Sequence, residues 1–98
     1  MSEKIHITVD PELKQFLPRY LDNRKRDLQI LREAIEKNDF KTLQSIGHKI
    51  RGHALSYGFD RLSSICAMIE KAAGEKKYEI IVSLLNEYRD YIENVDLE

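Results

Sequence analysis

The amino-acid sequence predicts an all-α protein: an up-down four-helix bundle with a short N-terminal arm and an extra N-terminal helix. Three observations support this fold class. Two Pro and four Gly in 98 residues leave few interruptions. Apolar residues recur at helical spacing along most of the chain. The segments between these apolar runs are short, and short connections make successive helices antiparallel neighbours, as in a four-helix bundle.

The N-terminal segment, residues 1–9, alternates apolar and polar residues but is too short to form a sheet by itself. We expect it to be an extended arm lying on the bundle. Asp10 and Pro11 then predict a helix start, because Asp accepts backbone N–H bonds and Pro lacks the N–H that would go unpaired there. Pro18 interrupts the apolar stripe that follows, so we expect a short helix to Leu17, a kink, and a long helix from Pro18. The stripe consists of Leu13, Phe16, Leu17, Tyr20, Leu21, Leu28, Leu31 and Ile35.

Three further helices follow from the breaks in the pattern. Asn38-Asp39 should end the long helix and cap the next, Gly58 and Gly74 should end two more, and the last should begin near Lys77. Each helix has one apolar stripe expected to face the core: Phe40, Leu43, Ile46, Gly47, Ile50, Ala54 and Tyr57; Phe59, Leu62, Ile65, Cys66, Ile69 and Ala73; and Tyr78, Ile81, Leu84, Leu85, Tyr88, Tyr91 and Ile92.

Composition and charge argue against several classes of protein. The net charge of −1 argues against a generally basic nucleic-acid binder. One Cys excludes an internal disulfide and a Cys-based zinc site. No apolar run approaches the roughly 20 residues of a membrane span, and the N-terminus lacks a signal-peptide core. We therefore expect one cytoplasmic domain over residues 1–98, with no membrane or nucleic-acid partner. We also expect a monomer, because four amphipathic helices can bury their own stripes.

Charge is unevenly distributed along the chain. Residues 19–51 hold nine Lys/Arg against five acidic residues, whereas residues 84–98 hold five acidic residues against Arg89. These residues can simply be solvated helix faces. Alternatively, the basic half meets an acidic partner, since charge asymmetry steers association.

His48 is the residue on which a functional hypothesis depends. Ile50, on the core stripe, lies about 200° from His48 around the helix, so His48 should point outward. Its neighbours on the outer face are Gln44, Ser45, Arg51, Gly52 and Leu55.

Gly52 is unusual there, because a Gly within a helix costs about 1 kcal/mol relative to Ala. Its presence indicates close approach of another molecule. An exposed imidazole can attack phosphorus, Arg51 can pair with phosphoryl oxygens, and Gly52 can admit a partner, so this surface predicts a phosphoryl-transfer site.

The stretch His48-Lys49-Ile50-Arg51-Gly52, followed by Gly58, Leu62 and Ile69-Glu70, resembles the pattern of histidine-containing phosphotransfer (HPt) domains. The resemblance covers nearly the whole chain, because that family is a four-helix bundle of about this length. It implies a carrier in a two-component phosphorelay that accepts a phosphoryl group from an aspartyl phosphate on a receiver domain and passes it to another receiver. A hybrid histidine kinase is a further expected partner.

The resemblance also assigns roles. His48 is the phosphoacceptor, Arg51 takes the place of the family's usual Lys and stabilises phosphoryl charge, and Gly52 gives the receiver access. Glu70 orients the imidazole by accepting from Nδ1–H, which leaves Nε2 as the nucleophile. His53 stands where the family usually has a small residue. The residues expected to contact the partner are Gln44, Ser45, Lys49 and Leu55.

The chain is not expected to be an independent enzyme, since it has no Gly-rich phosphate loop, no paired acids at metal-binding spacing and no Ser/His/Asp set. We expect no cofactor or metal in this chain; the partner receiver domain should supply Mg²⁺. Two alternatives remain open: a helical adaptor or scaffold without chemistry, and the dimerisation hairpin of a histidine kinase. The hairpin usually has an acid directly after the His, where this chain has Lys49. His53 is expected to be a partly buried structural residue, and Cys66 an inert buried thiol.

Overall fold

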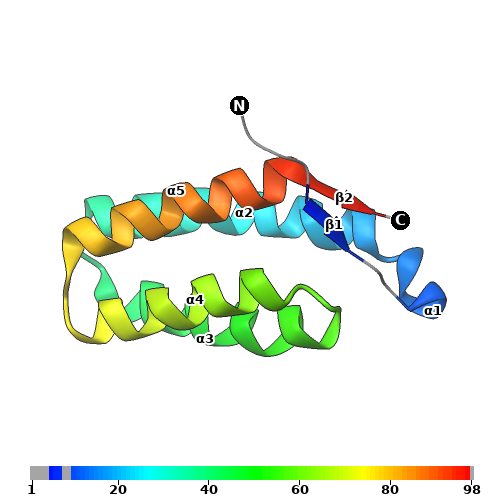
Figure 1. The fold of residues 1–98 in the computed structure, drawn as a ribbon. Helices are drawn as coiled ribbons and strands as arrows, with labels where there is room; N and C mark the ends of the chain where they lie inside the picture. The colour runs from blue at the N-terminus through cyan, green and yellow to red at the C-terminus, as the bar shows by residue number, and fades with distance from the viewer. Residues whose placement is uncertain (1–4, 8–9, 98) are drawn as a thin grey trace.

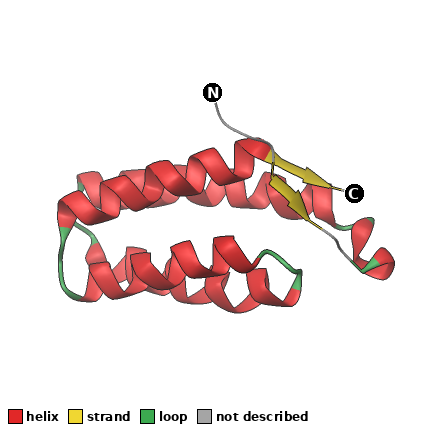
Figure 2. Cartoon of the chain, viewed as in Figure 1, coloured by secondary structure: helices red, strands yellow, loops and turns green. Residues whose placement is uncertain are grey.

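The computed structural model describes residues 5–7 and 10–97. In chain order the elements are β1 (Ile5–Ile7), α1 (Pro11–Lys14), α2 (Leu17–Glu36), α3 (Phe40–Ser56), α4 (Asp60–Gly74), α5 (Tyr78–Asn94) and β2 (Val95–Leu97), as Figure 1 shows. Helices make up most of the described chain, with the strand pair at one end (Figure 2). The all-α bundle with an extra N-terminal helix is thus confirmed.

The long helices form two layers. Helices α3 and α4 pack closely as one antiparallel pair, and α2 and α5 form the other (Figure 1). Where the layers meet, the core contains fully enclosed side chains from all four helices, among them Leu31, Leu43, Ile69 and Leu85. No helix in the described part of the chain is both long and apolar enough to cross a bilayer.

The helix boundaries follow local sequence signals. The Asp10 carboxylate accepts from the backbone N–H of Glu12 at 2.9 Å, directly before Pro11. The carboxylate of Asp39 accepts from the backbone N–H of Thr42 at 3.1 Å and so caps α3. Both predicted helix starts are therefore confirmed. Asn38 and Gly58, with φ of 54° and 89°, provide the left-handed turns that follow α2 and α3.

Two residues of the predicted apolar stripes do not face the core. Phe16 is 51% exposed because it lies at the junction of α1 and α2, where the stripe is interrupted by the turn before Pro18. Tyr78 is 44% exposed because it is the first residue of α5, beyond the part of that helix covered by its neighbours. Cys66 is fully buried as predicted, and burial raises the pKa of its thiol to about 12, so the thiol stays protonated.

The two ends of the described chain meet in a short parallel sheet. Strand β1 pairs with β2 in the register Ile5–Val95, His6–Asp96 and Ile7–Leu97. Residues 5–7 are extended, as expected for the N-terminal arm, but their pairing with β2 was not predicted; the rest of residues 1–9 lies outside the described residues. The strand went unrecognised because its partner is at the other end of the sequence, and a three-residue strand carries almost no local signal.

Gly47 determines how closely α3 approaches α4. A Cβ atom at this position would lie 3.0 Å from the carbonyl oxygen of Cys66 and 3.2 Å from the backbone nitrogen of Glu70. Both atoms belong to the α4 backbone, which cannot move aside as a side chain can. The residue before His48 must therefore be Gly for the two helices to pack at this distance.

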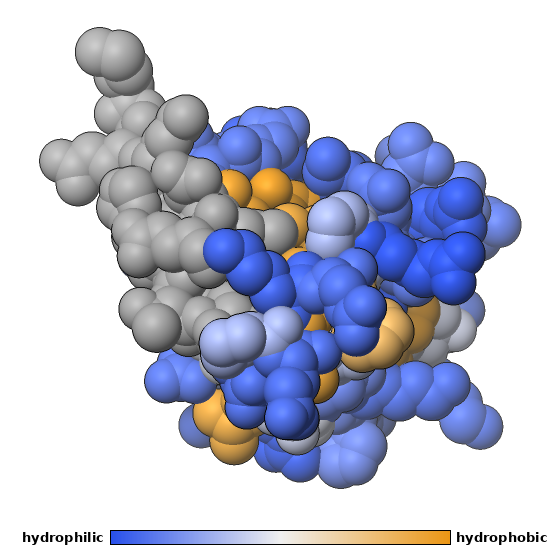
Figure 3. Space-filling view, turned by 90° about the vertical axis from the view of Figure 1, so that its right-hand side faces the viewer, coloured by the Kyte–Doolittle hydropathy of each residue, from blue (hydrophilic) through white to orange (hydrophobic). Residues whose placement is uncertain are grey.

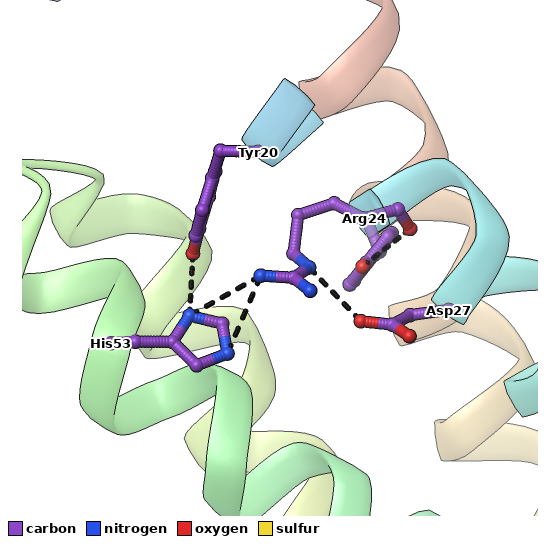
Figure 4. A network of polar contacts seen from close by, with 5 residues as sticks. Tyr20, Arg24, Asp27 and His53 are labelled. Carbon is purple, nitrogen blue, oxygen red and sulfur yellow. Dashed lines mark hydrogen bonds and ion pairs between the residues drawn. The ribbon is translucent and has the colours of Figure 1, made fainter. Parts of the chain in front are cut away.

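A polar cluster joins the two layers near His53 (Figure 4). The hydroxyl of Tyr20, on α2, lies 2.8 Å from His53 Nδ1, and Arg24 Nη1 lies 3.3 Å from each ring nitrogen. Arg24 also forms an ion pair with Asp27 at 2.9 Å, and its backbone carbonyl accepts from the hydroxyl of Tyr88 at 2.7 Å. His53 is half-buried and structural, as predicted.

The surroundings of His53 favour the neutral form of its imidazole. Burial lowers the pKa of the imidazole, and the charge of Arg24 lowers it further, against a smaller opposing effect of Asp27.

At the end of the molecule that carries α1 and the strands, the coloured surface is mostly hydrophilic with scattered apolar areas (Figure 3).

Candidate functional site

His48 lies in the middle of α3 and points outward. Its side chain is 62% exposed, whereas Gly47 and Ile50 on the same helix are buried. This difference is the one that the helical spacing predicted. The imidazole is therefore available to a macromolecular partner without any rearrangement of the bundle.

Glu70 holds the imidazole from the neighbouring helix. Its Oε2 atom lies 2.9 Å from His48 Nδ1, and its side chain is only 22% exposed. The close approach of α3 and α4 at Gly47 brings the two side chains together, since the Gly47 contact is with the backbone of Glu70 itself. A carboxylate can only accept, so it binds the tautomer with a proton on Nδ1 and leaves the Nε2 lone pair free.

Arg51, one turn after His48, completes a cluster of three side chains. Its Nη2 atom lies 3.1 Å from His48 Nδ1, and its Nη1 atom lies 3.3 Å from Glu70 Oε1. The Arg51 side chain is 44% exposed, so it is also accessible to solvent. The structure thus brings together the three side chains that sequence analysis singled out on two different helices.

Gly52 leaves the surface beside this cluster open. A Cβ atom at position 52 would meet no other atom within 4 Å, so packing within the described bundle does not require Gly there. Gly47 and Gly52 therefore differ: packing of α3 against α4 requires Gly at position 47, whereas no contact within the described bundle requires Gly at position 52.

A shallow hollow of about 400 Å³ adjoins His48. Its lining includes Gln44, Ser45 and Lys49, which were predicted to surround the site, together with His48 and Glu70. Lys41 also lines it and was missed by sequence analysis, although it lies two helical turns before His48 and helical periodicity could have identified it.

Leu55 is placed differently from the other predicted contact residues. It lies outside the lining of the hollow, but it is 60% exposed two turns after His48 on the outer face. The site therefore consists of a basic, polar hollow on one side of His48 and an exposed apolar side chain further along α3.

Ser63 supports the site from α4 and was also missed. Its hydroxyl donates to the backbone carbonyl of Arg51 at 2.8 Å, and the side chain is buried. Ser63 lies two turns before Glu70, so both residues lie on the side of α4 that faces α3. A buried Ser within a helix has no distinctive sequence signal. Its role depends on which carbonyl lies opposite.

His53 takes no part in this site. It contacts α2 through Tyr20 and Arg24, as Figure 4 shows. The two histidines of α3 point in different directions, because a spacing of five residues places them about 140° apart around a helix. Among the described residues, no three His, Cys, Asp or Glu side chains are grouped as metal ligands.

Comparison with known protein families gives one match. The family model described as "Hpt domain" matches residues 15–98. Comparison with curated proteins and with solved structures gave no match. The matched region includes the four long helices and every residue of the site, and it excludes β1 and α1.

Proposed function

The chain belongs to the Hpt domain family, modules of histidine phosphotransfer in phosphorelays, and on this premise we propose that His48 is its phosphoacceptor. The proposed donor is the aspartyl phosphate of a receiver domain, and a second receiver takes the phosphoryl group from His48. The chain then acts as a phosphoryl carrier without a kinase or ATP site of its own.

The contact between Glu70 and His48 Nδ1 carries this proposal, because it leaves Nε2 as the nucleophile on an open face. In the transfer, the Nε2 lone pair attacks phosphorus, the bond from phosphorus to the aspartyl oxygen breaks, and its electron pair restores the carboxylate of the receiver. The imidazole keeps its proton on Nδ1 and becomes positively charged. The Glu70 carboxylate, 2.9 Å away, stabilises that charge.

Arg51 and Gly52 serve the same step in different ways. The guanidinium of Arg51 can form paired hydrogen bonds with the phosphoryl oxygens as the group moves between partners. Donor and acceptor must come nearly into contact for in-line transfer, and the missing side chain at position 52 permits that approach.

The surface also suits the proposed partner. Lys41 and Lys49 line the hollow beside His48, and Arg51 adds a third positive charge. A receiver's phosphorylation pocket is acidic and binds Mg²⁺, so the basic surface favours its approach. We therefore propose that receiver domains, and a hybrid histidine kinase that carries one, dock over this face of α3 in the cytoplasm.

The test is incubation with a phosphorylated receiver domain from the same cell, followed by mapping of the modified residue. We expect acid-labile, alkali-stable phosphate on His48, loss of the label in His48→Gln, and substantial transfer to His53→Gln, the matched control on the same helix. Label that persists in His48→Gln would overturn the assignment. A protein that no receiver labels would instead fit the adaptor hypothesis.

A further inference from the structure

Nδ1 of His48 has two partners that require opposite protonation states. The Glu70 carboxylate, 2.9 Å away, can only accept, so it needs a proton on Nδ1. The Arg51 guanidinium, 3.1 Å away, can only donate, so it needs a lone pair on Nδ1. A neutral imidazole carries one N–H, and therefore each partner selects a different tautomer.

We propose that Arg51 is a positioning residue that holds part of the resting protein in a tautomer unable to accept phosphoryl. When the guanidinium donates to Nδ1, the ring proton is on Nε2, and the atom that should attack phosphorus has no free lone pair. When Glu70 accepts from Nδ1–H, Nε2 is the nucleophile. This inference rests on the proposed function, because it concerns the readiness of the same site.

The geometry permits exchange between the two states. Arg51 Nη1 also contacts Glu70 Oε1 at 3.3 Å, so the guanidinium stays beside the ring whichever group binds Nδ1. The imidazole is 62% exposed, and water can therefore take the proton from Nε2 and supply another to Nδ1. No helix needs to move.

An arriving phosphoryl group shifts this balance. Its charged oxygens are stronger acceptors for a guanidinium than a neutral ring nitrogen is. They draw Arg51 away from Nδ1 and leave Glu70 as the only partner, which selects the nucleophilic tautomer. Once phosphorus is bonded to Nε2, Nδ1 carries the proton, and Arg51 can no longer donate to it. The site thus becomes reactive when the donor arrives.

The test is nitrogen NMR of the unphosphorylated protein with ¹⁵N-labelled histidine, at about pH 8, where an ordinary imidazole is neutral. In the wild-type protein we expect both tautomers of His48. Arg51→Met keeps an apolar stem but has no donor, and it should raise the ratio of Nδ1–H to Nε2–H by about fivefold, as expected for loss of one hydrogen bond. Glu70→Met should shift the ratio in the opposite direction.

Lys71→Gln is the matched control, since it removes a positive charge next to Glu70 without removing a contact to the ring. It should leave the ratio unchanged. A wild-type His48 found only as Nδ1–H, or an Arg51→Met variant with an unchanged or lower ratio, would overturn the inference. The measurement needs no phosphoryl donor, so its failure is distinguishable from failure of the receiver assay.

Discussion

The two central glycines of α3 lie five residues apart and have opposite consequences for the fold. At Gly52 a Cβ atom would meet nothing, whereas at Gly47 it would be 3.0 Å from a backbone oxygen of α4. Replacing each Gly by Ala should therefore distinguish the effect of helix propensity on stability, at position 52, from the effect of helix packing, at position 47.

Gly52→Ala should raise the free energy of unfolding by up to about 1 kcal/mol, because Ala is the better helix former. Gly52→Gln should likewise melt no lower than the wild-type protein, yet lose most of its phosphotransfer rate, since the longer side chain stands where the receiver must approach. Thermal unfolding and a timed transfer assay measure the two effects. If Gly52→Gln transfers phosphoryl at the wild-type rate, the receiver does not dock over this surface. If Gly52→Gln fails to fold, Gly52 is required for the structure of the bundle.

Gly47→Ala should lower the free energy of unfolding by about 1–3 kcal/mol, the usual cost of overpacking, despite its gain in helix propensity. Because α4 would have to move away, the contact of His48 Nδ1 with Glu70 should also weaken. Urea denaturation measures the first effect and the His48 ring shifts measure the second. If Gly47→Ala were as stable as Gly52→Ala, this would contradict the claim that α3 and α4 lie too close together at position 47 to admit a side chain.

At the scale of elements, the polar cluster around His53 makes the contact between α2 and α3 sensitive to pH. Burial and the charge of Arg24 lower the pKa of His53 in the folded protein below its ordinary value of 6.5. The unfolded chain therefore takes up a proton more readily. The contribution of this residue to stability is present above the unfolded pKa, and it is lost as pH falls through 6.5 towards the lower folded value.

We expect the free energy of unfolding of the wild-type protein to fall more steeply than that of His53→Gln between about pH 7.5 and pH 5. Gln cannot be protonated, so the difference between the two curves isolates His53 from the other titrating groups. Urea denaturation across this range is the measurement. Parallel curves would show that the cluster binds the charged and neutral rings equally.

The helices could be predicted from the sequence because their signals are local. Asp10 and Asp39 cap helices within three residues of themselves, and the apolar stripes repeat within each helix. His48, Arg51 and Glu70 could be singled out because they match a family pattern. The roles of Ser63 and Gly47 could not be predicted, because each depends on a residue of another helix. Helical periodicity could have placed Lys41 on the face of His48, but only the shape of the surface shows that it lines the same hollow.

At the scale of the whole molecule, the exposed large apolar side chains of the described residues form no large continuous face, although Met68 and Ile80 line one small hollow between α4 and α5. They lie at the α1–α2 junction and on each of the long helices: Phe16, Ile30, Leu55, Met68, Tyr78 and Ile80. A stable dimer usually buries a continuous apolar face, and the helices already bury their stripes against one another.

We therefore expect a monomer at micromolar concentration, with a mass near 11.5 kDa in sedimentation equilibrium. The test should be repeated with Leu55→Ser, since Leu55 is the most exposed of these side chains at 60%. A mass near twice that value for the wild-type protein would contradict the prediction. A mass that returned to the monomer value in Leu55→Ser would place the interface on α3.

The pairing of β1 with β2 places the two ends of the described chain side by side, so the helices could be connected in a different order without changing their arrangement in space. Residues 5–7 lie beside residues 95–97, and the strands adjoin the layer of α2 and α5, whereas His48 lies on α3 (Figure 1). A short linker across the strand pair would therefore permit circular permutation, with the chain opened in the loop between α4 and α5. The helices would then follow one another in a new order, while His48, Arg51 and Glu70 kept every contact they have now.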